Sequence, residues 1–143
     1  MRIAIGCDHG GYELKEQLRR YLQNNGHEVI DCGTDSVESV HYPVFAKMVA
    51  KKVLRGEAER GIVVCTTGEG VCMTANRYKG IRCGIAYNDE VARLMRAHNN
   101  ANVVSFGARF ISLEDAIKRV EIFLNTGFEG GRHQTRLEML DED

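Results

Sequence analysis

Several features typical of membrane, secreted or metal-dependent proteins are missing from this sequence. Its longest apolar runs fall far short of the roughly 20 residues that a membrane-spanning helix needs. Strand-like sequence begins at Ile3, so we expect no signal peptide. The five cysteines show no Cys-x-x-Cys spacing, which argues against structural zinc. An odd number of cysteines without a secretory signal favours reduced thiols and a cytoplasmic location.

The sequence also lacks an excess of charge of either sign. Nineteen basic and twenty acidic residues give a formal net charge of −1, which provides no overall field to attract nucleic acid or an anionic membrane. We therefore expect neither as a partner, and any anion site must be a local cluster. With 143 residues, 43% hydrophobic and 27% charged, the chain suits one compact domain. No linker or repeat divides it.

Nucleotide-binding fingerprints are absent as well. The chain has no Gly-Lys-Ser/Thr motif of a P-loop, and Gly68 and Gly70 lack a third glycine because Met73 stands at that position. The segment 6–11, after the first expected strand, reads GCDHGG and does not match a dinucleotide fingerprint. We expect no nucleotide cofactor.

The sequence does contain a regular alternation of strand and helix patterns. Strands are expected near residues 3–5, 28–32, 61–65, 81–86 and 103–106. Helices are expected near residues 14–22, 42–53, 69–78, 89–95 and 113–124, and the second of these should face inward with Phe45, Met48, Val49 and Val53. Such alternation predicts a doubly wound, Rossmann-like α/β fold. Its sheet would be mostly parallel and five-stranded, with helices on both faces and a C-terminal helical tail.

The chain is organised around residues 61–71, GIVVCTTGEGV. Its β-branched run is typical of a strand buried on both faces, and it ends at Cys65, before small polar residues and two glycines. A cysteine facing a helix N-terminus sits where the thiolate form is favoured, and the loop amides could bind an oxyanion. Taken alone, a buried cysteine followed by a tight glycine turn explains the pattern at least as well.

Ligands of such sheets bind beyond the carboxyl ends of the strands, a rule that gathers Asp8, His9, Cys65 and Arg109 at one edge. His98 follows the fourth expected helix and should lie near the opposite edge. If His98 is catalytic, we expect it to serve the site of a neighbouring subunit.

The C-terminal tail carries a second basic feature. Arg132 and Arg136 are four residues apart and would share one face of a helix, where two guanidiniums suit phosphate oxygens. A solvated helix is the simpler explanation of this pair on its own, and His133 is interpreted as a structural residue.

Seven short motifs run along the chain, at residues 6–11 (GCDHGG), 41–43 (HYP), 65–70 (CTTGEG), 75–76 (AN), 98–103 (HNNANV), 106–109 (FGAR) and 130–136 (GGRHQTR). In this order, and over nearly the whole chain, they resemble B-type ribose-5-phosphate isomerases. That family of sugar-phosphate isomerases also includes galactose-6-phosphate isomerase subunits. The resemblance implies an aldose–ketose isomerase that interconverts ribose 5-phosphate and ribulose 5-phosphate through an enediolate, without metal or cofactor.

The resemblance also implies roles for individual residues. Cys65 would be the base that moves a proton between C1 and C2, and Thr67 would help to stabilise the enediolate oxygen. His98 would be the acid that opens the furanose ring. Arg109, Arg132 and Arg136 would hold the phosphate. The sugar would contact Asp8, His9, Tyr42, Thr66, Gly68, Glu69, Gly70 and Asn99.

Family members are dimers, some of which pair further, with active sites built across the interface. The resemblance therefore implies a homodimer, with the tetramer left open, in which the tail, residues 126–143, contacts the partner subunit. The loop after Cys65 departs from the family pattern: Thr66 replaces a glycine, Glu69 replaces an apolar residue, and residues 72–74 also differ from the usual continuation. These differences leave two alternatives open. One is an isomerase of a six-carbon sugar phosphate, of the galactose 6-phosphate or allose 6-phosphate type. The other is a sugar-phosphate-binding module without catalysis.

Overall fold

The computed structural model describes all 143 residues and contains one five-stranded sheet, all of whose strand pairs are parallel. The strand order is β2-β1-β3-β5-β4. The strands are β1 (Arg2–Cys7), β2 (Glu28–Asp31), β3 (Arg60–Cys65), β4 (Cys83–Ile85) and β5 (Val103–Gly107). The sheet thus confirms the predicted parallel, five-stranded fold.

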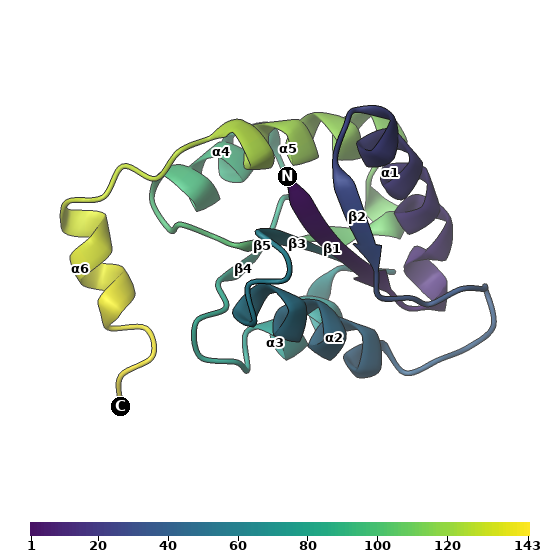
Figure 1. Cartoon of the computed structure of the whole chain (residues 1–143), viewed down its shortest axis with the longest axis horizontal. Coiled ribbons are helices and arrows are strands. Elements are labelled where there is room, and N and C mark those ends of the chain that lie inside the picture. Colours follow the sequence, from purple (N-terminus) through teal and green to yellow (C-terminus); the bar gives the residue numbers. More distant parts are fainter.

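Helices cover both faces of this sheet (Figure 1). They are α1 (Tyr12–Asn24), α2 (Tyr42–Leu54), α3 (Glu69–Ala75), α4 (Asp89–Ala97), α5 (Leu113–Asn125) and α6 (Arg132–Glu138). Buried side chains of α1, α4 and α5 form one apolar cluster on the sheet, and those of α2 and α3 form another on the opposite face. The arrangement is therefore doubly wound, as predicted. No helix combines the length and the apolar character needed to cross a membrane.

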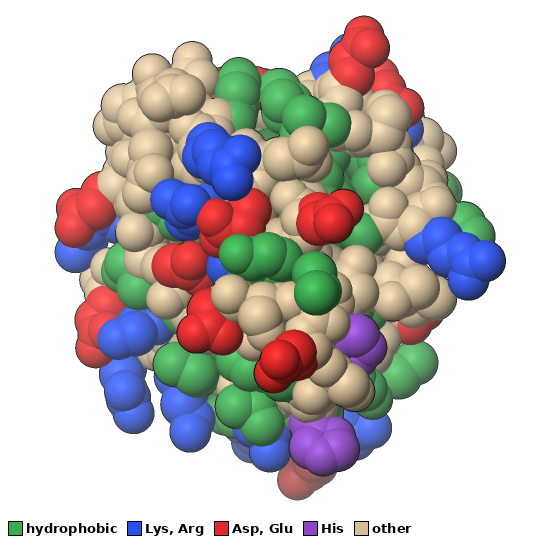
Figure 2. Space-filling view, turned by 90° about the vertical axis from the view of Figure 1, so that its right-hand side faces the viewer, with side chains coloured by type: hydrophobic (Ala, Val, Ile, Leu, Met, Phe, Trp, Pro, Cys, Tyr) green, Lys and Arg blue, Asp and Glu red, His purple; other side chains and the backbone are tan.

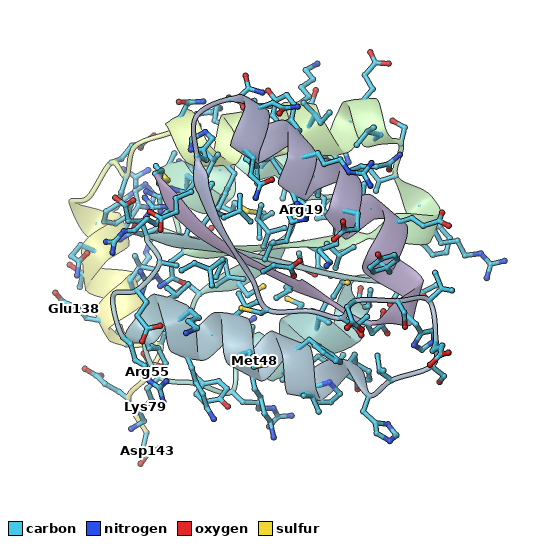
Figure 3. The ribbon with its side chains drawn as sticks, turned by 45° about the vertical axis from the view of Figure 1, so that its right-hand side comes forward. Arg19, Met48, Arg55, Lys79, Glu138 and Asp143 are labelled. Carbon is cyan, nitrogen blue, oxygen red and sulfur yellow. The ribbon has the colours of Figure 1, made fainter.

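The predicted inner face of α2 is wrong at Met48, which is 43% exposed and lies on the outer surface of the helix (Figure 3). Ala46, Val49 and Ala50 face the sheet instead. The reason is close packing: a Cβ on Gly6 would lie 2.8 Å from Val49 Cγ2, and one on Gly61 would lie 2.7 Å from Val49 Cγ1. Because Gly6 and Gly61 have no side chains, α2 packs very close to the sheet, and small residues therefore form the face of α2 that contacts the sheet.

Two expected elements are shorter than predicted. Helix α3 stops at Ala75, since the Asn76 side chain exchanges two 2.8 Å hydrogen bonds with the backbone of Cys83. Strand β4 begins only at Cys83, because the N–H of Arg82 donates to Asn102 Oδ1 (2.8 Å) rather than to a strand carbonyl. Side chains therefore set both boundaries.

The C-terminal tail leaves the body of the domain after α5 and ends in α6, at the side opposite the carboxyl ends of the strands (Figure 1). Two consecutive glycines with positive φ, Gly130 and Gly131, precede this helix. Among the contacts that the tail makes with the body, the N–H of Glu129 donates to Ala97 O (3.0 Å), and that of Gly80 donates to Asp141 Oδ2 (2.9 Å). The predicted helical tail is confirmed.

A buried cation joins α1 to β2. The Lys15 side chain is fully buried, and its Nζ lies 2.9 Å from Glu16 Oε1 and 3.1 Å from Asp31 Oδ2. Arg19 Nε also donates to Glu16 Oε1 (3.2 Å). The hydrogen bond from Arg19, joined by that from Lys15, lowers the pKa of Glu16 to about 2. An ionised Glu16 thus stabilises the folded state.

This network predicts a stability difference that disappears in acid. Glu16→Gln should lower the free energy of unfolding at pH 7 by about 1.5–3 kcal/mol, as for hydrogen bonds to charged groups. The native pKa lies below the unfolded value of 4.5, so this contribution is complete above pH 4.5 and is lost as pH falls toward 2. Urea unfolding of both proteins across this range measures it. A difference that stays constant down to pH 2 would contradict the assignment.

Candidate active site

The fold contains one topological switch point. Strands β1 and β3 are neighbours, but the chain leaves β1 toward β2 at one edge and leaves β3 toward β4 at the other. Adjacent parallel strands with diverging connections open a crevice at their carboxyl ends, where ligands of such sheets bind. The two loops at this crevice are those that carry Asp8 and His9 after β1 and Cys65–Gly70 after β3.

Cys65 closes β3 and is 6% exposed, on the side of the sheet that α2 and α3 cover. Its Sγ accepts a hydrogen bond from the backbone N–H of Gly68 (3.1 Å). Gly68 has a φ of +80°, and this left-handed conformation turns the chain back toward the thiol. The sulfur therefore lies at the inner wall of the loop that follows it.

Other polar atoms of this loop form hydrogen bonds within the loop or with β5. Thr67 Oγ1 accepts the N–H of Glu69 (3.2 Å), and Ser105 Oγ donates to Gly68 O (2.7 Å). The side chains of Thr67 and Glu69 are exposed, and Thr66 and Gly70 are half-buried. The loop thus presents a hydroxyl and a carboxylate beside the cysteine.

The loop after β1 packs directly against it. Asp8 is buried, donates its N–H to Val64 O (3.3 Å) and accepts the N–H of Gly11 through Oδ1 (3.2 Å). His9 Nδ1 accepts the N–H of Val40 (3.2 Å), which leaves Nε2 to carry the proton of a neutral ring. A Cβ on Gly10 would lie 2.2 Å from Thr66 Oγ1. The sequence prediction that these loops meet is confirmed.

Tyr42 and Arg109 complete this edge from two further elements. The ring of Tyr42 lies against Gly70, where a Cβ would be 2.6 Å from Tyr42 Cε1. Arg109 follows β5, and its N–H donates to Thr66 O (3.1 Å). Arg109 and His9 line a common hollow of about 390 Å³. Figure 2 shows this side of the molecule, with charged side chains of both signs around apolar ones.

A larger hollow, of about 760 Å³, lies beside the same loop. Its lining includes Thr67, Glu69, Cys72, Tyr87 and Phe110. The last two are 70% and 74% exposed. The hollow therefore has two large, exposed aromatic side chains in its lining, beside the loop that carries Thr67 and Glu69.

The remaining predicted residues form a second group at the opposite edge of the sheet. His98 caps the C-terminus of α4, and its ring stacks on that of His133 with centroids 4.2 Å apart. Asn99 is exposed and lines a hollow with Arg82 and Asp141. The structure therefore separates His98 and Asn99 from Cys65 within one chain, as the sequence prediction requires.

The three predicted phosphate-binding arginines are likewise divided. Arg109 lies with His9 at the carboxyl edge, whereas Arg132 and Arg136 are exposed on α6. Within one chain no single anion could touch all three, because α6 lies beyond the other end of the sheet (Figure 1).

The sequence interpretation missed Glu129 and underrated His133. His133 is 7% exposed, and its Nε2 lies 3.6 Å from Glu129 Oε1. Burial, followed by the neighbouring His98 and Arg132, lowers the pKa of His133 below its usual value. His98, Glu129 and His133 place one potential metal-ligating atom each within 4.8 Å of the others. The four-residue spacing of Glu129 and His133 was the only signal available in the sequence.

The turn after Cys65 leads to a prediction with a matched control. A Cβ on Gly68 would lie 3.0 Å from the backbone of Phe106 and Gly107, whereas a Cβ on Gly26 (φ +85°) would meet nothing within 4 Å. Gly26→Ala should cost about 1–2 kcal/mol for the left-handed conformation alone. Gly68→Ala should cost more and should displace the loop from Cys65. Urea unfolding measures both variants, and equal losses would contradict the proposed close packing.

Comparisons with known proteins identify the family of this chain. The sequence model of the Ribose/Galactose Isomerase family matches residues 3–140. The chain is 44% identical over 139 residues to ribose-5-phosphate isomerase B of Escherichia coli, covering 97% of this chain and 93% of that protein.

Solved structures show the same similarity. Ribose-5-phosphate isomerase B of Clostridium thermocellum is 46% identical, has a TM-score of 0.98, and is matched over 99% of this chain and 96% of its own. The Mycoplasma genitalium enzyme, solved with bound ribulose-5-phosphate, is 39% identical with a TM-score of 0.92, over 97% and 93% of the two chains. On these matches, the chain belongs to the ribose/galactose isomerase family.

Proposed function

We propose that this chain is an aldose–ketose isomerase that interconverts ribose 5-phosphate and ribulose 5-phosphate. The observation that carries the proposal is the position of Cys65, at the switch point of the sheet, with its sulfur against the loop that presents Thr67. A thiolate there would remove a proton from C2 of the open-chain aldose and return one to C1. The relative that was solved with ribulose-5-phosphate supports this substrate class.

The enediolate that forms between these two proton transfers carries negative charge on oxygen. Thr67 would donate its hydroxyl hydrogen to that oxygen, and backbone N–H groups of the loop that have no other acceptor would donate to it as well. A preorganised donor of this kind stabilises the transition state by about 3–4 kcal/mol. The amides of Gly68 and Glu69 already bind Cys65 and Thr67. Asp8, His9 and Tyr42 would contact the sugar from the neighbouring loops.

The second group of residues would reach the substrate from a partner subunit. His98 would protonate the ring oxygen and open the furanose, Asn99 would orient the sugar, and Arg132 and Arg136 would join Arg109 on the phosphate. This arrangement requires a homodimer whose tail, residues 126–143, contacts the partner. The exposed Tyr87 and Phe110 beside the loop supply apolar surface for such contact. We also propose the cytoplasm as its location, where the five free cysteines stay reduced.

A substrate panel tests the proposal. The purified protein is assayed with ribose 5-phosphate, ribulose 5-phosphate, allose 6-phosphate and galactose 6-phosphate, and kcat/KM is the deciding quantity. We expect the five-carbon pair to be preferred. Preference for a six-carbon sugar would assign a different substrate. Thr66 and Glu69 would then be the first residues to test as the cause of that preference. Saturable binding without turnover of any member would contradict catalysis.

A further inference from the structure

A cluster outside the proposed catalytic loop has the composition of a metal site. Glu129 Oε1 lies 3.7 Å from His98 Nε2 and 3.6 Å from His133 Nε2. All three potential ligand atoms lie within 4.8 Å of one another. The residues come from the end of α4, from the segment before α6, and from α6 itself. Three separate positions of the chain thus converge on one point.

The state of His133 points independently to a missing ligand. The residue is 7% exposed, and its Nε2 is buried without any hydrogen-bond partner. Burying a polar nitrogen without a partner is unfavourable, so an atom bound at this nitrogen would remove that penalty. The nitrogen faces Glu129, whose backbone is fixed to α4 by the 3.0 Å hydrogen bond to Ala97 O.

We propose that His98, Glu129 and His133 bind a divalent transition-metal ion such as Zn²⁺. Two imidazoles and one carboxylate match the ligands that zinc accepts, whereas Mg²⁺ and Ca²⁺ require mainly oxygen ligands. Arg132 and Arg136 lie on the same short helix and repel any cation. The bonds to the two imidazoles and the carboxylate must outweigh that repulsion, which weakens binding of every divalent ion.

Binding requires a small local adjustment. The two imidazole rings are stacked with an interplanar angle of 14°, and a zinc ion lies in the plane of each imidazole that binds it, about 2.0–2.1 Å from the nitrogen. One ring must therefore turn. His98 is the ring that can turn, because its side chain is 37% exposed whereas that of His133 is 8% exposed. The buried His133 ring holds its place, the half-exposed Glu129 carboxylate adjusts to the ion, and His98 rotates onto it.

The consequence for activity rests on the proposed function. If His98 opens the furanose ring, an ion bound to its Nε2 removes the proton that the reaction needs. The site would then be inhibitory, and zinc would inhibit the enzyme by sequestering its ring-opening acid. Metal binding itself depends only on the cluster.

The test is a titration of the metal-free, full-length protein with CoCl₂ as a spectroscopic probe and with ZnCl₂ by calorimetry. We expect one ion per chain, visible absorption bands of a nitrogen- and oxygen-ligated Co²⁺, and no near-ultraviolet charge-transfer band from a thiolate. Glu129→Gln and His133→Gln should each weaken binding at least tenfold. Glu138→Gln removes an exposed acid from the same helix (Figure 3) and should leave affinity unchanged.

Three results would overturn the proposal: absence of binding at millimolar metal, equal affinity in Glu129→Gln and the parent protein, or a thiolate band that assigns the ion to a cysteine. Activity is measured separately, with each protein's metal-free rate as its own reference. Zn²⁺ should inhibit the parent protein over the concentrations at which it binds, and Glu129→Gln should resist inhibition. Failure of the metal-free protein to isomerise ribose 5-phosphate would contradict the proposed function but would leave the binding result intact.

Discussion

Cys65→Ala should abolish exchange of the C2 proton of ribose 5-phosphate with solvent and should lower kcat by about 10²–10⁴-fold, the range for loss of a general base. Removing the sulfur takes away the proposed base, and the neighbouring Thr67 hydroxyl is too weakly basic to replace it. Binding that depends on the phosphate should survive, since the arginines are untouched. Deuterium incorporation followed by NMR, together with the coupled assay, measures both effects.

Cys32→Ala is the matched control for this variant. Cys32 is also a buried free thiol, 5% exposed, and it belongs to the same apolar cluster as Cys65. Both substitutions remove a sulfur from that cluster and should cost similar amounts of stability, but Cys32→Ala should keep turnover close to that of the parent. Retained exchange in folded Cys65→Ala would reject Cys65 as the base.

The layout of the carboxyl edge could be predicted from the sequence because local rules determine it. The β-branched run before Cys65 specifies a buried strand, and alternation of strands with helices specifies parallel pairing. The switch-point rule then gathers Asp8, Cys65 and Arg109 without any knowledge of side-chain contacts. A helix that connects two parallel strands runs in the opposite direction to them. Its C-terminus, which carries His98, therefore lies at the other end of the sheet from Cys65.

What the sequence could not predict depends on contacts between distant segments. The exposure of Met48 results from two glycines on β1 and β3 that draw α2 close to the sheet. Lys15 is fully buried, against the usual preference of lysine for the surface, because Glu16 and Asp31 neutralise it. The stacking of His98 on His133 depends on the path of a tail that turns through consecutive glycines with positive φ. No local pattern encodes that path.

The central claim is that one active site contains Cys65 of one chain and His98 of the other. Within one chain the two residues lie at opposite edges of the sheet, so the claim predicts complementation between two inactive variants. Cys65→Ala and His98→Gln are each expected to be nearly inactive. A heterodimer that carries one of each has one site with both substitutions and one site with neither.

The most direct test is the activity of that heterodimer, obtained by co-expressing the two variants with different affinity tags and purifying through both. By two-fold symmetry, one of its two sites is intact, so it should have about half the activity of the parent dimer. Each variant homodimer, purified in the same way, provides the baseline. Activity of the heterodimer near half that of the parent would support the shared site, whereas activity no higher than the homodimer baseline would contradict it.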